Sequence, residues 1–416
     1  MYDEIYVGLD IGTTKVTAVV TQASGPDELV VIGIGQTQCY GLKKGVVVNI
    51  EVTGEAISRA IEEAEFQAGV EINKVNVSIS GEHVESLNKE GDIAVSSKTR
   101  EITLKEETRV IEHAQMIKLS SDREIIHVFP QEFIVDDQEG IRSPVGMSGV
   151  RLKAKVHIVT GANSAITNLV KSVNRVGYHV DNIILSAYAA GEAVLTEDEK
   201  ELGVLVVDFG GGTTDAAVYM GGAIQHSFIF PFAGSSITKD ISYGLKTPDA
   251  AAEMIKMNYG CASSHIVNPH EIIEVPGVGG RAPSKMDKML LTSIIEPRVE
   301  EVFGQIYKEL FNKGLLKHIS AGVVITGGTA LMPGMTDIAE RVFSLPTRIG
   351  HPRGLSSSGF NDIVSRPDCA SAVGLALYGL RHDSNLISDR YNNQMSSDKG
   401  RTFSKKVTGF LKEFFN

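Results

Sequence analysis

Residues 204–218 read VLVVDFGGGTTDAAV. The apolar run 204–207 predicts a strand buried on both faces, Asp208 ends it, and a second apolar run follows Asp215. Glycines without side chains let backbone N–H groups approach an anion, and threonine hydroxyls add donors. A carboxylate at the end of a buried strand favours a hydrated Mg²⁺ that offsets its charge. The pattern predicts a hairpin that holds a metal–phosphate group through Gly210, Gly211, Gly212, Thr213 and Thr214.

The same pattern occurs near the N-terminus, where residues 7–20 read VGLDIGTTKVTAVV. Asp10, Gly12, Thr13 and Thr14 follow an apolar strand in the same order, and Lys15 comes next as a candidate phosphate ligand. A single copy would be read more simply as an ordinary glycine-rich hairpin. Two copies indicate an internal duplication of a phosphate-binding hairpin, spaced too widely for a solenoid.

Composition narrows the class of protein. The 416 residues are 42% hydrophobic and 22% charged, which is typical of a soluble globular protein large enough for two or more cores. The net charge of −11 argues against nucleic acid as a partner. Three widely spaced cysteines offer no metal or disulfide pattern and fit a reducing cytosol. The acidic N-terminus is not expected to be a signal peptide. The sequence contains no run of eighteen apolar residues, so no membrane-spanning segment is predicted.

The first half of the chain predicts an α/β domain with an insertion. Strands are expected over residues 5–9, 16–21, 29–34 and 75–79, with a helix over 53–68. Residues 81–160 are more charged and predict a small α+β module. In it, Thr103 and Glu106 form a capping box before a helix to about Ile117, and strands are expected over 124–135 and 150–159.

The second half predicts further helices around the mid-chain hairpin. Helices are expected over residues 163–176, in two short pieces over 234–256, over 285–311 despite Pro297, and over 368–380. Residues 183–195 predict a turn and a close-packed helix, 271–275 a strand, and 277–284 a loop. Residues 322–334 read GVVITGGTALMPG, which predicts a strand, a double-glycine turn and a helix start.

The C-terminal end predicts a linker and an amphipathic helix. Residues 382–402 are polar and predict a flexible linker. In residues 403–416, apolar side chains fall on one helical face, flanked by basic ones that suit anionic lipid. The predicted membrane residues are Phe403, Val407, Phe410, Leu411, Phe414 and Phe415, with Lys405, Lys406 and Lys412. The helix is too short to span a bilayer and should lie in its interface, although packing on the protein itself or in a partner groove remain alternatives.

Together, the two hairpins and the later ITGGTALMPG turn resemble the nucleotide motifs of the actin-like ATPase superfamily. The resemblance implies two related α/β lobes that clamp ATP with Mg²⁺. It implies that Asp10 and Asp208 hold the Mg²⁺ through water, and that residues 12–15 and 210–214 bind phosphate. It also assigns the following residues to the nucleotide: Gly234, Glu253, Lys256, Gly327, Gly328, Thr329 and Met332. Residues 187–192 and 370–374 match its two crossing connector helices.

Within this superfamily the chain is most similar to the FtsA family of bacterial cell-division proteins. The matching segments include GLDIGTTKV, KELGVLVVDFGGGTTD and FAGSSITKDISYGLKT. The expected fold is α/β, a two-lobed actin-like ATPase fold with a small α+β module inserted in the first lobe. The expected domains are 1–80 with 161–202, the module 81–160, 203–233 with 312–381, a second-lobe subdomain 234–311, the linker 382–402 and the helix 403–416.

The family resemblance implies a function that composition does not show. It implies self-association into filaments that tether the FtsZ ring to the cytoplasmic face of the inner membrane, at the division septum, as a peripheral membrane protein. It implies binding of the C-terminal FtsZ peptide by subdomain 234–311, and contacts with anionic lipid and later division proteins.

One departure from the superfamily bears on catalysis. Relatives carry an acidic residue before the connector helix, where this chain has Leu185-Ser186-Ala187. Because a serine cannot act as a carboxylate base, ATP binding with weak or no ATPase activity is expected. A pilus-assembly ATPase and a sugar-kinase or chaperone-type ATPase remain alternative functions.

Overall fold

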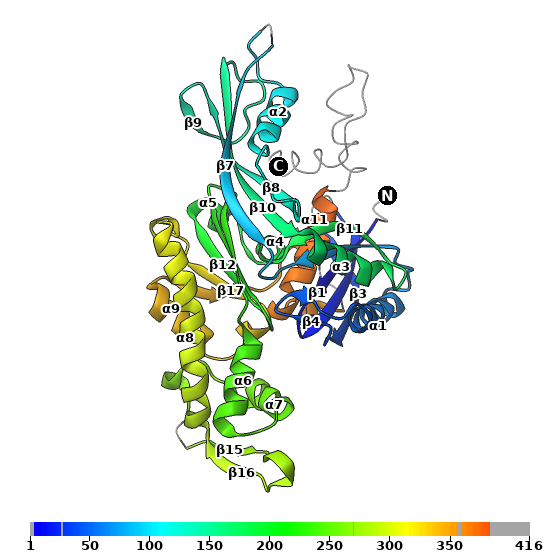
Figure 1. Ribbon diagram of the computed structural model, residues 1–416, viewed down its shortest axis with the longest axis vertical. Helices are drawn as coiled ribbons and strands as arrows, with labels where there is room; N and C mark the ends of the chain where they lie inside the picture. The colour runs from blue at the N-terminus through cyan, green and yellow to red at the C-terminus, as the bar shows by residue number, and fades with distance from the viewer. Residues whose placement is uncertain (1–3, 26–27, 98, 269, 357–358, 383–416) are drawn as a thin grey trace.

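A computed structural model describes residues 4–25, 28–97, 99–268, 270–356 and 359–382. Two lobes lie side by side in the middle of the molecule (Figure 1). The inserted module extends from one end of this pair, and the subdomain of residues 234–311 extends from the other. The predicted linker after His382 and the amphipathic helix 403–416 lie outside the described residues.

The first lobe contains a mixed five-stranded sheet in the order β11-β6-β1-β2-β3. Its strands are β1 (Ile5–Ile11), β2 (Lys15–Ala23), β3 (Leu29–Gln38), β6 (Lys74–Ile79) and β11 (His179–Leu185). Helices α1 (Ile50–Ala68), α3 (Asn163–Asn174) and α11 (Ala370–His382) pack with this lobe. Helix α1 begins where the Asn49 side chain accepts hydrogen bonds from two backbone N–H groups, and ends at Gly69 with φ +67°.

The second lobe repeats this arrangement in the order β14-β13-β12-β17-β18. Its strands are β12 (Val204–Phe209), β13 (Thr214–Met220), β14 (Ala223–Phe230), β17 (Val323–Thr326) and β18 (Thr347–Ile349). In each lobe an antiparallel hairpin is joined by a parallel strand, β6 on β1 and β17 on β12. This repetition fits the duplication that the two glycine–threonine motifs predict.

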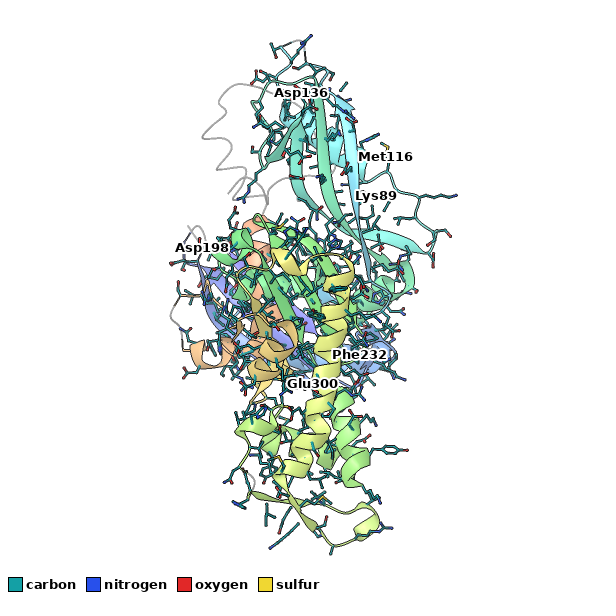
Figure 2. All side chains as sticks on the ribbon, turned by 90° about the vertical axis from the view of Figure 1, so that its left-hand side faces the viewer. Lys89, Met116, Asp136, Asp198, Phe232 and Glu300 are labelled. Atoms are coloured by element: carbon teal, nitrogen blue, oxygen red, sulfur yellow. The ribbon has the colours of Figure 1, made fainter. Side chains whose placement is uncertain are left out.

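The inserted module is a four-stranded antiparallel sheet in the order β7-β10-β8-β9, with one helix on it. Its elements are β7 (Glu85–Ala94), α2 (Leu104–Ala114), β8 (Arg123–Val135), β9 (Gln138–Ile141) and β10 (Arg151–Ala162). The capping box of Thr103 and Glu106 is confirmed, although α2 ends at Ala114 rather than Ile117. At the outer end of the module (Figure 2), the Asp136 carboxylate accepts hydrogen bonds from the N–H groups of Val150 and Arg151, each at 2.9 Å.

Side chains of the module cover the free edge of β14 in the second lobe. Ser86 Oγ donates to the Ser227 carbonyl at 2.9 Å, and Asn88 Nδ2 donates to the Gln225 carbonyl at 3.1 Å. Gln131 Nε2 donates to the same Gln225 carbonyl at 2.9 Å. An uncovered strand edge offers unpaired backbone groups to any other strand. The module therefore protects a sheet that belongs to the other lobe.

The second-lobe subdomain is largely helical. It contains α6 (Gly234–Leu245), α7 (Asp249–Tyr259), the ribbon β15 (Ile272–Val275) with β16 (Ser284–Asp287), and the long helix α8 (Lys288–Asn312). Helix α8 continues through Pro297, as expected. The shorter elements of the chain are β4 (Leu42–Lys43), β5 (Val46–Val47), α5 (Glu197–Leu202), α9 (Met335–Phe343) and α10 (Asn361–Val364).

Several expectations about local structure were wrong. Residues 285–287 were expected to begin the long helix, but they lie in the strand β16. Residues 183–185 were expected in a turn, but they end the strand β11, which pairs with β6. The expected linker start, His382, is the last residue of α11. The strand β7 was not expected, because its sequence ESLNKEGDIA is mostly polar and lacks the apolar alternation that marks a strand. β7 is held by its pairing with β10, which is remote in sequence.

The lobes are joined where α4 (Ser186–Val194) crosses α11. At the crossing the backbones touch: a Cβ on Gly374 would lie 1.7 Å from the Ala189 carbonyl oxygen. A Cβ on Gly8 would lie 1.9 Å from the Ala372 carbonyl oxygen, so α11 also lies directly on β1. Glycine is required at both positions by this close approach. Within the described residues, no helix combines the length and apolar character that a bilayer span needs.

Replacing Glu107 with glutamine is expected to stabilise the module at alkaline pH. Glu107 is 1% exposed, its Oε2 has no hydrogen-bond partner among the described residues, and burial raises its pKa to about 7. Its folded pKa therefore lies above the unfolded value, so stability present at low pH is lost as the pH rises through 7. The free energy of unfolding should rise by about 1–3 kcal/mol at pH 8 and change little at pH 5, measured by urea unfolding.

The neighbouring residue supplies a matched control. The hydrogen bond from Thr103 holds the pKa of Glu106 below its usual value, so Glu106→Gln should give no gain at pH 8. An equal gain from both substitutions would show that the burial of Glu107 is not the cause.

Candidate functional site

The two duplicated hairpins meet tip to tip between the lobes. The same turn closes both: Gly12 N–H donates to the Lys15 carbonyl, and Gly210 N–H to the Thr213 carbonyl, each at 3.0 Å. A Cβ on Gly211 would lie 2.4 Å from Thr14 Oγ1. The tips are therefore in contact, and glycine is what allows it.

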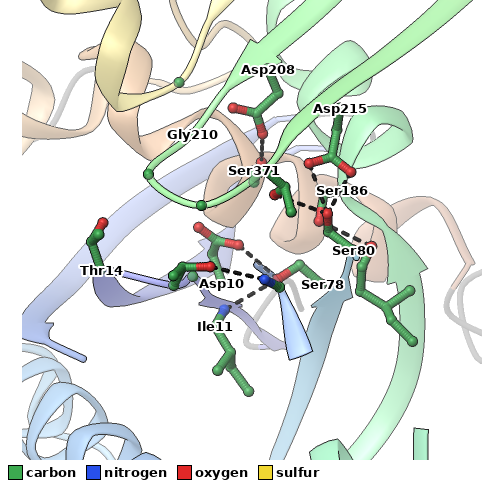
Figure 3. Close-up of a pocket in the computed structure, with 18 of the residues that line it drawn as sticks. Asp10, Ile11, Thr14, Ser78, Ser80, Ser186, Asp208, Gly210, Asp215 and Ser371 are labelled. Carbon is green, nitrogen blue, oxygen red and sulfur yellow. Dashed lines mark hydrogen bonds between the residues drawn. The ribbon is translucent and has the colours of Figure 1, made fainter. Parts of the chain in front are cut away.

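Behind these tips lies a cavity of about 110 Å³ that both lobes line (Figure 3). It brings together the following expected site residues: Asp10, Gly12, Thr13, Thr14, Lys15, Asp208, Gly210, Gly211, Gly212, Thr213, Gly327 and Gly328. Further lining residues, which the sequence did not single out for binding, include Ser78, Ser80, His83, Asp215, Asp368 and Ser371.

Asp10 and Asp208 enter the cavity from the ends of equivalent strands. Asp10 Oδ1 accepts a hydrogen bond from Ser78 Oγ, and Asp208 Oδ2 accepts one from Ser371 Oγ, each at 2.7 Å. Removal from water, with the charge of Asp10 nearby, raises the pKa of Asp208 to about 7. Removal from water also raises the pKa of Asp10. A hydrated divalent cation between them would relieve this cost, because Mg²⁺ is commonly held by one or two carboxylates and several waters.

Asp215 joins this carboxylate group and was not expected to face the site. It was expected to brace its own hairpin, but its two carboxylate oxygens accept from Ser80 Oγ of the first lobe at 2.6 and 2.8 Å. Removal from water and the charge of Asp208 raise its pKa to about 8. The sequence held a signal for this, since Asp208 and Asp215 are direct cross-strand partners and so share one face of the hairpin.

Lys15 forms an ion pair across the site. Its Nζ lies 2.8 Å from Asp368 Oδ2 and 3.3 Å from the Asp368 carbonyl oxygen. Burial alone would raise the pKa of Asp368, but the charges of Lys15 and Arg366 outweigh it and hold that pKa below its usual value. Lys15 is thus positioned at the cavity by a residue 353 positions away, while its role toward phosphate stays a prediction.

Gly327 and Gly328 line the cavity, but the other residues assigned to the nucleotide by resemblance form a second group, against the outer side of the Gly210 turn. Thr329 Oγ1 donates to the Gly210 carbonyl at 2.8 Å, and Lys256 Nζ donates to the Gly234 carbonyl at 3.1 Å. Lys256 also forms the i, i+3 ion pair with Glu253 at 2.7 Å. Met332 is buried near Gly260. In the described part of the chain this group lies beside the cavity rather than in its lining, and its role stays a prediction.

The expected phosphate residue Thr214 and the serine that replaces the acid of relatives, Ser186, both have structural partners. Thr214 Oγ1 donates to the Phe232 carbonyl at 2.9 Å, which turns this side chain away from the cavity. Ser186 does line the cavity, and its Oγ donates to the Ile79 carbonyl at 3.1 Å. The place where relatives carry an acid is therefore occupied by a hydroxyl that is already engaged, with Asp215 as the nearby carboxylate (Figure 3).

Solved structures show the same fold at low sequence identity. A PilM–PilN type IV pilus biogenesis complex matches with a TM-score of 0.66, 15% identity, and coverage of 90% of this chain and 98% of that chain. MreB5 of Spiroplasma citri bound to ADP matches with a TM-score of 0.55, 15% identity, and coverage of 94% and 99%. These neighbours establish a two-lobed actin-like ATPase fold.

Sequence comparisons give the family. The family model described as cell division protein FtsA matches residues 205–374, and the SHS2 domain inserted in FtsA matches residues 81–160. The cell division protein FtsA of Pseudomonas aeruginosa is 45% identical over 92% of this chain and 91% of its own length. That of Escherichia coli K12 is 39% identical over 99% and 98%, and that of Borreliella burgdorferi 40% identical over the full length of both. The chain belongs to the FtsA family of cell division proteins.

Proposed function

We propose that this protein binds ATP with Mg²⁺ between its lobes and forms filaments that tether the FtsZ ring to the membrane. The observation that carries the nucleotide site is the pair of facing hairpins, each with a carboxylate and a glycine–threonine turn around one cavity. Backbone N–H groups and threonine hydroxyls suit phosphate, and Asp10 with Asp208 suits a hydrated Mg²⁺.

ATP acts here mainly as a ligand that sets the angle between the lobes. The tips at Gly211 and Thr14 are in contact, so a phosphate group fits between them only when the lobes separate. Nucleotide binding and lobe opening are therefore coupled by differential affinity for the open state. The hydroxyl of Ser186 in the acid position fits slow hydrolysis.

The subdomain 234–311 is the proposed docking site for the FtsZ C-terminal peptide. Met254 and Met257 are 57% and 76% exposed, and their i, i+3 spacing places them on one face of α7. Further exposed large apolar side chains of this subdomain are Tyr243, Tyr259, Ile266, Ile272, Val278, Leu290 and Phe311. Such a concentration of apolar surface is typical of a protein-binding site, and methionines adapt well to peptide ligands.

The segment 403–416 is the proposed membrane anchor, and this proposal rests on its sequence alone. One short amphipathic helix binds lipid reversibly, so filaments carrying many such helices would attach more firmly than single molecules. We include in the same proposal that this protein contacts later division proteins. The protein would then act at the cytoplasmic face of the inner membrane, at the septum.

Flotation of FtsZ with anionic vesicles in the presence of ATP and Mg²⁺ tests the tether. The unchanged protein should carry FtsZ to the vesicle fraction. Met254→Glu with Met257→Glu should float alone and leave FtsZ behind, because charge disrupts an apolar peptide site. Phe410→Glu with Phe414→Glu should leave both proteins unfloated.

Phe66 provides the control for this experiment. It is 89% exposed on α1 of the first lobe, so Phe66→Glu makes the same chemical change away from both proposed surfaces and should float FtsZ normally. Normal flotation of FtsZ by the methionine variant would refute the docking site, and flotation of the phenylalanine double variant would refute the anchor.

A further inference from the structure

His83 lies in the short segment that leads from β6 of the first lobe into β7 of the inserted module. It lines the cavity between the lobes, together with Ser80 and Thr13. Both ring nitrogens, Nδ1 and Nε2, are buried and have no hydrogen-bond partner among the described residues. A buried polar group without a partner costs about 1–3 kcal/mol, so an unpaired imidazole at a phosphate-binding cavity points to a ligand.

The backbone of His83 is fixed by the inserted module. Arg123 Nη2 of β8 donates to the His83 carbonyl at 2.9 Å and to the Thr160 carbonyl of β10 at 3.2 Å. Arg123 also forms an ion pair with Glu85 at 3.1 Å. On the other side, Gly81 with φ +122° leaves the ring room, since a Cβ there would lie 3.0 Å from His83 Nδ1. The backbone that carries the ring is therefore anchored beside the cavity.

The surroundings of the His83 imidazole favour its neutral form. Burial lowers its pKa, and the positive charge of Arg123 lowers it further. A neutral imidazole carries one N–H donor and one acceptor nitrogen. It can therefore donate one hydrogen bond to a phosphate oxygen without adding a charge to the site.

The position of His83 in the cavity indicates which phosphate it would meet. Gly327, at the proposed adenosine turn, packs against Asp208, since a Cβ on Gly327 would lie 2.3 Å from Asp208 Oδ1. His83 follows Ser80, which binds Asp215. Figure 3 shows Ser80, Ser186 and Asp215 gathered on one side of the cavity and Gly210 on the other. The Gly210 carbonyl accepts a hydrogen bond from Thr329 of the adenosine turn at 2.8 Å. Because His83 comes only three residues after Ser80, we infer that it lies on the side of the cavity away from that turn.

We propose that His83 donates a hydrogen bond to the terminal phosphate of bound ATP and so gives the site its preference for ATP over ADP. This rests on the proposed ATP site. A hydrogen bond to a charged phosphate is stronger than one between neutral groups, and ADP would leave the imidazole unpaired. Because Arg123 binds the same residue, the terminal phosphate is also connected to the inserted module through one side chain.

The test measures the affinities for Mg·ATP and Mg·ADP in the full chain and in His83→Phe and His83→Gln. Phenylalanine keeps a ring and removes both nitrogens, whereas glutamine keeps an N–H donor. The ratio of ATP to ADP affinity should fall about tenfold in His83→Phe and return toward the original value in His83→Gln. ADP affinity should stay the same in both variants.

Stability separates this role from a structural one. Because the ring nitrogens are unpaired, His83→Phe should keep or raise the unfolding temperature without nucleotide. An unchanged affinity ratio in a folded His83→Phe protein would overturn the inference and leave the ATP site intact. If His83→Phe failed to fold, an unchanged ratio in His83→Ala would overturn it equally. Failure of the unchanged protein to bind either nucleotide would instead refute the proposed function itself.

Discussion

Replacing Gly374 with alanine should lower the free energy of unfolding by about 3 kcal/mol or more, the largest loss of stability expected from a methyl group added at any glycine of the described residues. The added Cβ would lie 1.7 Å from the Ala189 carbonyl oxygen and 2.5 Å from its carbon. Both are backbone atoms of α4, so no side-chain rotation can relieve the overlap. The two helices would have to separate at the junction of the lobes. Urea unfolding of the full chain measures the change.

Gly304 is the matched control, since it is also a helical glycine. It lies in α8, and a Cβ there would meet no atom within 4 Å. Gly304→Ala should leave stability unchanged or raise it by up to about 1 kcal/mol, because alanine favours helix more than glycine does. Equal effects of the two substitutions would mean that α4 and α11 are not in backbone contact.

Replacing Asp208 with asparagine should weaken Mg²⁺-dependent ATP binding by about 10–100-fold, the largest functional loss expected outside the membrane anchor. Asparagine has the same shape and keeps an acceptor for Ser371 Oγ, which lies 2.7 Å from Asp208 Oδ2. The substitution therefore removes mainly the charge that opposes the metal. Titration with a fluorescent ATP analogue, with and without Mg²⁺, measures the effect.

The same substitution should stabilise the protein in the absence of nucleotide. The folded pKa of Asp208 is raised to about 7 by removal from water and by Asp10, so ionisation opposes folding above that pH. The unfolding temperature at pH 8 should rise in Asp208→Asn and change little at pH 5. Asp92→Asn is the opposite control, because Arg151 holds the pKa of exposed Asp92 below its usual value. Full Mg²⁺ dependence in Asp208→Asn would remove Asp208 from the metal site.

Local chemistry was enough to predict much of the fold. The hairpin turns, the Thr103 capping box and the helix stop at Gly69 depend on residues within a few positions of each other, and sequence shows them directly. The strand β7 could not be predicted in this way, because its polar sequence is held by β10. The side chains of β7 that face the second lobe are polar, because they donate hydrogen bonds to backbone carbonyls there.

The parts of the candidate site that are repeated in the two hairpins could be predicted from the sequence. The contacts between the lobes could not. Asp10 and Asp208 are recognisable because each ends an apolar strand before a glycine turn. The pairs Lys15–Asp368 and Ser80–Asp215 join residues 353 and 135 positions apart, and no spacing rule connects them. His83 belongs to no motif and was not singled out from the sequence.

Because the inserted module covers the edge of β14, a deletion of the module would also expose that strand. The module is inserted in one lobe, yet its Ser86, Asn88 and Gln131 donate hydrogen bonds to backbone carbonyls of the other. A chain with residues 81–160 excised would present a bare strand edge, which invites intermolecular β-pairing and precipitation. Insolubility of such a deletion would then report an unmasked sheet rather than a lost partner. Substituting single residues on the outer surface of the module, with β7 and β8 kept, separates these two causes.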